Sequence, residues 1–109
     1  MGKMEKTLEI KKEHLVDPLK LKRASLVFRA VNHKLRQQIL QFIHRKGRVI
    51  VTDIYVKLRL EQSVASQQLA ILRKEEIVLT ERDGKFIFYS VNYERIKQLH
   101  RVADELLKK

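Results

Sequence analysis

Apolar residues recur at helical spacing from Pro18 to about Ile77, which predicts a run of helices. Asp17 followed by Pro18 is typical of an N-cap with proline at the first helical position, so a first helix is expected to start there. Asn32 is predicted to cap a second helix, and Gly47 is predicted to end it in the C′ position. The second helix carries one apolar stripe with a period near 3.6, formed by Leu35, Ile39, Phe42 and Ile43.

Two further helices are predicted after a short β-prone link, RVIV. Thr52 or Asp53 is expected to cap a short third helix, and a few residues of turn then lead into the fourth. Within the fourth helix, Ala65, Leu69 and Leu72 fall at positions i, i+4 and i+7. We expect these three side chains to face the core.

After Ile77 the apolar period changes to two residues. The segment VLTERDGKFIFYSV contains two β-prone runs around Asp83-Gly84, which predicts a hairpin with a type I′ turn. The last segment is predicted to be a helix with one apolar stripe, formed by Ile96, Leu99, Ala103 and Leu106. The order predicts a mainly α winged helix-turn-helix with a small β-hairpin, spanning residues 18–109. Residues 1–17 would form an N-terminal arm or a short helix.

The composition changes this picture by suggesting a partner. The 109 residues suit one domain, and 44% are hydrophobic, which indicates a folded protein. The net charge is +11, which favours a polyanion, nucleic acid first and a membrane surface second. Residues 26–50 hold six Lys or Arg and no acidic residue, whereas residues 51–91 hold six charges of each sign. Cysteine is absent, and no apolar run reaches signal-peptide or membrane-spanning length, so a cytoplasmic protein is expected.

One face of the fourth helix carries only short or amide side chains, where a solvated helix usually carries Lys and Glu. Four of them lie within its first two turns, namely Gln62, Ser63, Ser66 and Gln67. The second helix of a helix-turn-helix enters the DNA major groove, which is about 12 Å wide, and reads base edges there. We therefore predict that these four residues read DNA bases. The alternative is an ordinary solvated face, with Ser63 capping the helix.

Basic residues beside this helix and the hairpin are suited to contact DNA phosphates, which position a protein without reading sequence. They are Lys57, Arg59, Arg73, Arg82 and Lys85. The alternative is a set of solvated charges with local acidic partners, drawn from Glu75, Glu76, Glu81 and Asp83. The zero net charge of residues 51–91 also suggests weaker binding, or binding that depends more on the basic second helix.

The stretch LEQSVASQQLAILRKEEIV, within residues 24–92, resembles the ArsR/SmtB family of bacterial and archaeal winged-helix repressors. That family's reader helix follows the pattern LSQSxVSxHLxxLRxAGLV. The matches are Leu60, Gln62, Ser63, Ser66, Leu69, Leu72, Arg73 and Val78. The resemblance implies a homodimer that joins through its first and last helices, binds a palindromic operator, and responds to an effector, often a metal ion. The departures are Glu61 for the capping Ser, Gln68 for His, and Glu76 for the Gly that ends the helix.

The family's effector residues are missing here. The resemblance places thiol ligands of arsenic and cadmium sensors at Ile50 and Thr52. It places the zinc ligands of the last helix at Tyr93, Arg95, Leu106 and Lys109, which are no plausible zinc set. The four histidines lack metal-ligand spacing, and they are His14, His33, His44 and His100. We therefore predict no metal site and no cofactor, and the effector stays unknown.

The sequence thus predicts a homodimeric, sequence-specific regulator of transcription, a repressor, whose partners are double-stranded DNA and a second copy of the chain. The predicted dimer interface contains Leu19, Val27, Ile96, Leu99, Ala103 and Leu106. A winged helix that binds another protein, or a regulator with an unrecognised metal or small-molecule effector, are the alternatives. Enzymatic activity is not expected, because no catalytic triad order, carboxylate pair or phosphate loop stands out.

Overall fold

The computed structural model describes residues 15–108, so most of the predicted N-terminal arm lies outside the described part of the chain. Helices and strands follow in the predicted order, which confirms the mainly α winged helix-turn-helix with one hairpin. The elements are α2 (Pro18–Val31), α3 (Lys34–Lys46), α4 (Val51–Lys57), α5 (Gln62–Lys74), β1 (Val78–Asp83), β2 (Phe86–Val91) and α6 (Tyr93–Leu107).

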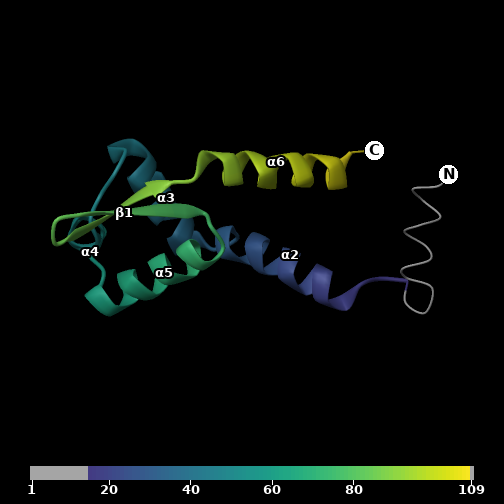
Figure 1. The fold of residues 1–109 in the computed structure, drawn as a ribbon, viewed down its shortest axis with the longest axis horizontal. Coiled ribbons are helices and arrows are strands. Elements are labelled where there is room, and N and C mark those ends of the chain that lie inside the picture. Colours follow the sequence, from purple (N-terminus) through teal and green to yellow (C-terminus); the bar gives the residue numbers. More distant parts are fainter. Residues whose placement is uncertain (1–14, 109) are drawn as a thin grey trace.

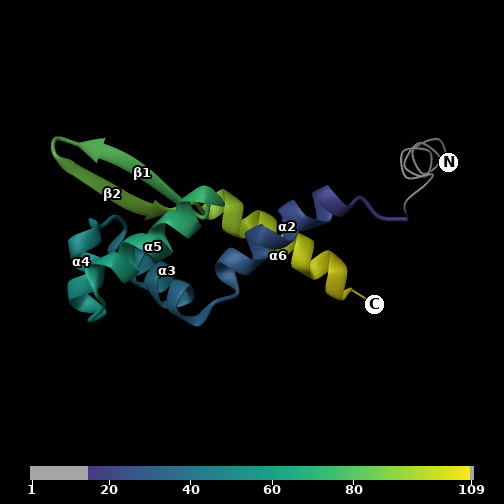
Figure 2. The same ribbon diagram turned by 90° about the horizontal axis from the view of Figure 1, so that it is seen from below.

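Helices α3, α4 and α5 pack together beside the hairpin, and α2 and α6 project from this body in the same direction, away from α4 (Figures 1 and 2). The buried residues come from every element from α2 to α6. The largest fully buried side chains are Ile39, Ile43, Ile54, Leu69, Leu72 and Ile77. The predicted inward positions of α3 and α5 therefore do form the core. Because α4 and α5 share this core, α5 is held with one face inward and one face in solvent.

The helix ends match the sequence signals in part. Asp17 caps α2, and its side chain accepts a hydrogen bond from the amide of Lys20 at 3.1 Å. Gly47 ends α3 with a φ of 89°, a conformation that few other residues adopt. The predicted cap of α3 at Asn32 is wrong, because Asn32 ends α2 and His33 caps α3. The Nδ1 atom of His33 accepts from the amide of Arg36 at 3.3 Å.

The predicted cap of α4 is also displaced. The helix begins at Val51 after Ile50, so Thr52 and Asp53 lie inside it. Asp53 still stabilises the helix start, because its Oδ2 accepts a hydrogen bond from the Ile50 amide at 3.1 Å. An acidic residue in the first turn interacts favourably with the positive end of the helix dipole. From the sequence alone, such a residue is easily mistaken for the cap itself.

The hairpin has the predicted place but a different turn. Asp83 pairs with Phe86, so the two turn residues are Gly84 and Lys85. Only Gly84 has a positive φ, 63°, whereas a type I′ turn needs positive φ at both central residues. The predicted type I′ turn is therefore wrong, and glycine at the first central position is the type II′ pattern. Val49 forms an isolated antiparallel bridge with Tyr89, which ties the α3–α4 link to β2.

Glu76 stands at the family's glycine position after α5 and has a φ of 61°. A non-glycine residue there costs about 1–2 kcal/mol, partly offset by the greater freedom of glycine in the unfolded chain. We therefore expect Glu76→Gly to raise the free energy of unfolding by up to about 1 kcal/mol and the melting temperature by a few degrees. Thermal unfolding followed by circular dichroism measures both. The control is Glu75→Gly, at a φ of −92°, which should lower stability.

Candidate nucleic-acid interface

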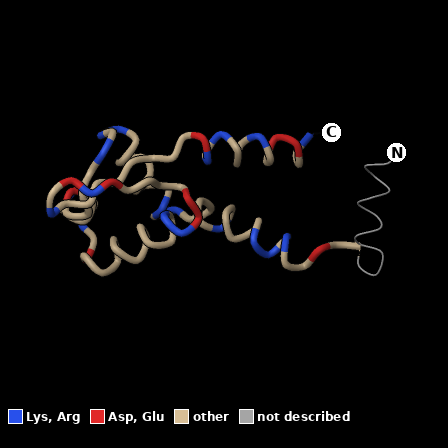
Figure 3. The backbone as a smooth tube through the Cα atoms, in the orientation of Figure 1, with Lys and Arg blue, Asp and Glu red and all other residues tan. Residues whose placement is uncertain are grey.

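The exposed face of α5 is free of charge over the first three turns. Gln62, Ser63, Ser66 and Gln67 are all exposed, while Ala65, Leu69 and Leu72 are buried on the opposite face. Figure 3 shows α5 as an uncharged stretch over most of its length, in contrast to the charged segments around it. The four predicted base-reading residues therefore lie together on one solvent-facing surface at the start of the helix.

The start of α5 has no side-chain cap. Glu61 is the N-cap residue and makes no side-chain cap bond, so the helix begins without the capping serine of the family pattern. Ser63 lies inside the helix, as its second residue, so the interpretation of Ser63 as a cap is wrong. The turn before it is held by its backbone, because the Leu60 amide donates to the Tyr55 carbonyl at 2.9 Å and Arg59 takes a φ of 56°.

The five basic residues predicted to contact phosphates are all exposed, and none forms an ion pair within residues 15–108. Lys57 ends α4, Arg59 lies in the turn, and Arg73 lies in the last turn of α5. Arg82 and Lys85 lie at the hairpin, where the Arg82 guanidinium donates to the Gly84 carbonyl at 3.5 Å. Of the alternative, solvated charges with local acidic partners, only the ion pairs are missing among the described residues, namely those with Glu75, Glu76, Glu81 and Asp83.

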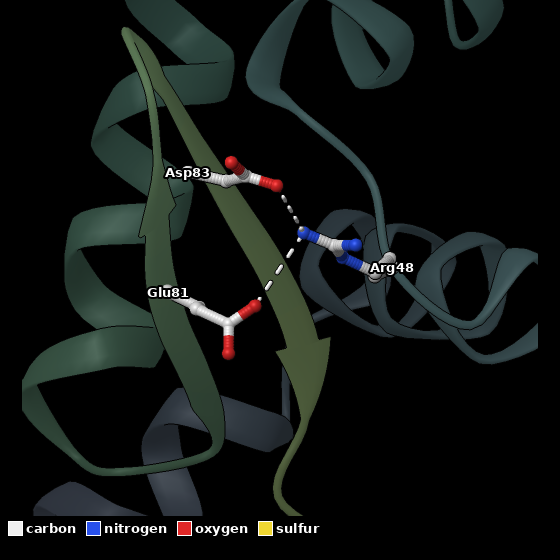
Figure 4. A network of polar contacts seen from close by, with 3 residues as sticks. All are labelled: Arg48, Glu81 and Asp83. Carbon is white, nitrogen blue, oxygen red and sulfur yellow. Dashed lines mark hydrogen bonds and ion pairs between the residues drawn. The ribbon is translucent and has the colours of Figure 1, made fainter.

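Two acidic residues of the hairpin, Glu81 and Asp83, instead form ion pairs with Arg48, which lies just after α3 (Figure 4). Its Nη2 atom lies 3.4 Å from Glu81 Oε1 and 3.8 Å from Asp83 Oδ2, and its guanidinium lies 3.7 Å from the ring centroid of Phe88. Both ion pairs are exposed and contribute little to stability. Their consequence is electrostatic, because the single positive charge of Arg48 partly offsets the two carboxylates on one face of the hairpin.

Arg82 lies on the other face of the hairpin. Side chains alternate between faces along a strand, so Arg82 points opposite to Glu81 and Asp83. It lies on the same side as its strand partner Ile87 and as Tyr89, two residues further along β2. Tyr89 lines a hollow together with residues of α5, which are Ser66, Leu69, Ala70, Arg73 and Lys74. The face of the hairpin that carries Arg82 therefore borders α5, and the acidic face points away from it.

Two arginines with structural roles were missed from the sequence. Arg48 gives no local signal, because its partners lie on β1, more than 30 residues away. Arg36 is 7% exposed, and burial lowers the pKa of its guanidinium. A signal for Arg36 does exist, since it precedes the buried Ile39 and Ile43 by three and seven residues and so falls on their helical stripe.

The predicted interface residues differ in how much surface they leave free. Leu19 and Leu106 are 64% and 75% exposed, and Val27, Ile96 and Ala103 are half-buried. Leu99 is only 7% exposed, so its own chain already buries it. This predicted interface residue therefore leaves little surface for a second copy of the chain. Further exposed apolar side chains lie on the same two helices, namely Leu21, Val102 and Leu107.

Histidine and acidic side chains do not gather into a set of three with metal-binding geometry anywhere in residues 15–108. His44 instead lies 2.6 Å from the hydroxyl of Tyr93, measured from its Nδ1 atom. His14 lies outside the described residues. In the same part of the chain, no helix combines the length and apolar character that crossing a bilayer requires.

Comparison with known proteins places this geometry in a family. The chain is 31% identical over 87 residues to the HTH-type transcriptional regulator MJ1325 of Methanocaldococcus jannaschii, covering 80% of this chain and 98% of that one. The transcriptional repressor SdpR of Bacillus subtilis is 32% identical over 66 residues, which cover 61% of this chain and 72% of SdpR.

Solved structures show the same fold. An ArsR-like transcriptional regulator from Rhodococcus sp. RHA1 superposes with a TM-score of 0.71 at 17% identity, covering 80% of this chain and 81% of that one. No protein-family model matches the chain. Three observations point to one family. They are the winged helix-turn-helix fold, the uncharged outer face of α5, and the sequence identity with MJ1325 and SdpR. The chain belongs to the ArsR/SmtB family of winged-helix, DNA-binding transcriptional regulators.

Proposed function

We propose that the chain is a cytoplasmic repressor that binds an inverted-repeat operator as a homodimer, with one α5 helix in each of two major grooves. The observation that carries this proposal is the exposed face of α5, where Gln62, Ser63, Ser66 and Gln67 stand free of charge. Short side chains let a helix lie deep in the groove, and amide and hydroxyl groups match the hydrogen-bonding pattern of base edges. The name of the relative SdpR, a transcriptional repressor, supports repression as the outcome.

Surface that the single chain leaves uncovered supports the homodimer. Leucines on α2 and α6 remain largely exposed, and these two helices project together from the body of the molecule (Figure 1). Exposed apolar surface of this kind marks an interaction site. A second copy packed on α2 and α6 would present two α5 helices related by a two-fold axis. Two α5 helices arranged in this way match half-sites about 34 Å apart on one face of the DNA.

The hairpin is proposed to act through the backbone of the DNA. Arg82 lies on the hairpin face that borders α5, and Lys85 lies at its turn. Both cations lack acidic partners within the described residues, so both are available to neutralise phosphates. Lys57, Arg59 and Arg73 would add contacts around α5. Release of counterions then makes the affinity fall as the salt concentration rises.

We expect Arg82→Ala to weaken binding to all DNA sequences alike and to lower the slope of log affinity against log salt by about one. The reason is that one phosphate contact releases about one condensed counterion. Fluorescence anisotropy on a labelled duplex over a salt series measures the slope. Arg48→Ala is the matched control, because Arg48 already pairs with Glu81 and Asp83 on the other face. A slope that Arg82→Ala leaves unchanged would remove the hairpin from the contacts.

The effector is proposed not to be one of the metal ions that the family's known sites bind. Ile50 and Thr52 occupy the thiol positions that the family resemblance implies, and neither side chain is a soft metal ligand. Tyr93 is engaged with His44 at 2.6 Å and begins α6, where the zinc ligands of the family would lie. Elemental analysis of purified protein, expected to find no stoichiometric metal, checks this.

The experiment that tests the proposed function is selection of bound sequences from a random duplex library, near physiological salt. Enrichment of one inverted repeat supports a dimeric, sequence-specific regulator and supplies the operator probe. Enrichment of a single half-site would support base reading by α5 but contradict the dimer. Recovery of unenriched DNA, or of none, would contradict base reading and favour a winged helix that binds another protein.

A further inference from the structure

The guanidinium of Arg36 joins the end of α2 to the middle of α5. Its Nε donates to the Ala30 carbonyl at 2.6 Å, and its Nη2 donates to the Arg29 carbonyl at 3.1 Å. Its Nη1 donates to the side-chain Oε1 of Gln68 at 2.8 Å. Arg36 is the only buried charged side chain among residues 15–108, and no carboxylate pairs with it there. Oxygen atoms of two helices therefore satisfy its charge.

This arrangement suits arginine for a geometric reason. The guanidinium is a rigid, planar fork, so two bonds to successive carbonyls at the end of α2 fix its plane. A cation is also stabilised at a helix C-terminus, where the carbonyl ends of the peptide dipoles point. The third bond then specifies where Gln68 lies relative to α2. Gln68 directly follows Gln67 on α5, so the same bond restrains the rotation of α5 about its axis.

The two helices joined in this way have different proposed tasks. Helix α2 contributes exposed leucines to the proposed dimer face, and α5 carries the proposed base-reading residues. The apolar contacts of Ala65, Leu69 and Leu72 hold α5 in the core, but such contacts are not directional. The hydrogen bond from Arg36 to Gln68 is directional, and it is half-buried, where water competes less for it.

We infer that Arg36 and Gln68 are positioning residues that set the orientation of α5 relative to the dimer helices, and thereby the half-site spacing that the dimer accepts. The inference rests on the proposed function. Without the bond, α5 keeps its core contacts and its base-reading side chains, so binding to one half-site is preserved. The match of two half-sites at one fixed spacing is lost, because each α5 is less preorganised.

Four variants separate positioning from general stability. Gln68→Met removes the acceptor at nearly constant length, and Gln68→Glu keeps an acceptor for Arg36. Arg36→Lys keeps the positive charge but loses the planar fork. Gln38→Met is the matched control, because Gln38 is an exposed glutamine on α3. The thermal unfolding of each variant is measured first, so that affinities can be compared at equal concentrations of folded protein.

The measured quantity is the ratio of affinities for two duplexes. One is the best inverted repeat of the unaltered protein, and the other has its spacer lengthened by two base pairs, which rotates one half-site by roughly 70°. We expect Gln68→Met and Arg36→Lys to lower this ratio roughly tenfold, the scale of one charge-assisted hydrogen bond. Gln68→Glu and Gln38→Met should keep the ratio of the unaltered protein. Affinity for a single half-site should be unchanged in all four.

Two outcomes overturn the inference. If Gln68→Met and Arg36→Lys weaken all duplexes equally and keep the ratio, the bond only stabilises the fold. If the unaltered protein shows no preference between the two spacings, the proposed dimeric function fails and the inference fails with it. Should Gln68→Met not fold, the ratio measured for Arg36→Lys decides the question on the same scale.

Discussion

Replacing Leu106 with glutamate is expected to separate the proposed dimer and to lower the affinity for the inverted repeat by roughly two orders of magnitude. Leu106 is 75% exposed near the end of α6, so the single chain loses little packing with this change. In the dimer, the same change would bury an unpaired carboxylate against apolar surface, which costs several kcal/mol. A separated protomer binds one half-site at a time. It loses the gain in effective concentration that a dimer obtains from its two linked α5 helices, which is worth about 10²–10⁴ in affinity.

Sedimentation equilibrium measures the oligomeric state, and anisotropy with the inverted repeat measures the affinity. The control is Leu79→Glu, because Leu79 is 50% exposed on β1, which is not one of the two helices of the proposed interface. This control should remain dimeric. Affinity for an isolated half-site should be nearly the same in both variants. A Leu106→Glu protein that stays dimeric with unchanged affinity would place the interface elsewhere on the molecule.

Replacing Gln67 with alanine is expected to cost about 1–3 kcal/mol at the cognate site and to relax the base preference there. Gln67 is exposed on α5 beside Ser66, and its amide can donate and accept at once in a bidentate pair with adenine. Alanine keeps the helix and removes the pair, so the fold is retained. Gln62→Ala is expected to act in the same way at another base.

Competition between the cognate duplex and a scrambled duplex, near physiological salt, measures this effect. Binding to scrambled DNA should be unchanged, because it depends on phosphate contacts and not on base edges. The control is Gln38→Ala, an exposed glutamine on α3, which should leave both affinities as they are. Equal losses on the two duplexes would mean that Gln67 does not read bases.

Local signals predicted the elements better than their ends. His33 and not Asn32 caps α3, because the side chain of His33 is the one that reaches the Arg36 amide. Both residues have suitable polar atoms, and the choice depends on how the chain turns between α2 and α3. The hairpin turn shows the same limit, since a shift of one residue changes the turn from Asp83-Gly84 to Gly84-Lys85.

The balance of charge in residues 51–91 is a second case where position decides. The zero net charge suggests weak DNA binding when it is read along the chain. In space, Glu81 and Asp83 lie on one face of the hairpin, where they pair with Arg48 (Figure 4). Arg82 lies between them in β1, so its side chain points to the other face. Arg82 is therefore not paired with the acidic residues that flank it in the chain.

The sequence by itself determined the order of helices and hairpin, the inward residues of α3 and α5, and the uncharged outer face of α5. These features follow from periodicity within single elements, and an amphipathic period has one way to bury its apolar side. Only the tertiary structure decided that Leu99 is covered within its own chain, that Arg48 pairs with two carboxylates of β1, and that Arg36 joins α2 to Gln68. Each of these depends on side chains brought together from distant segments, and such contacts exist only after the core has set the distances between them.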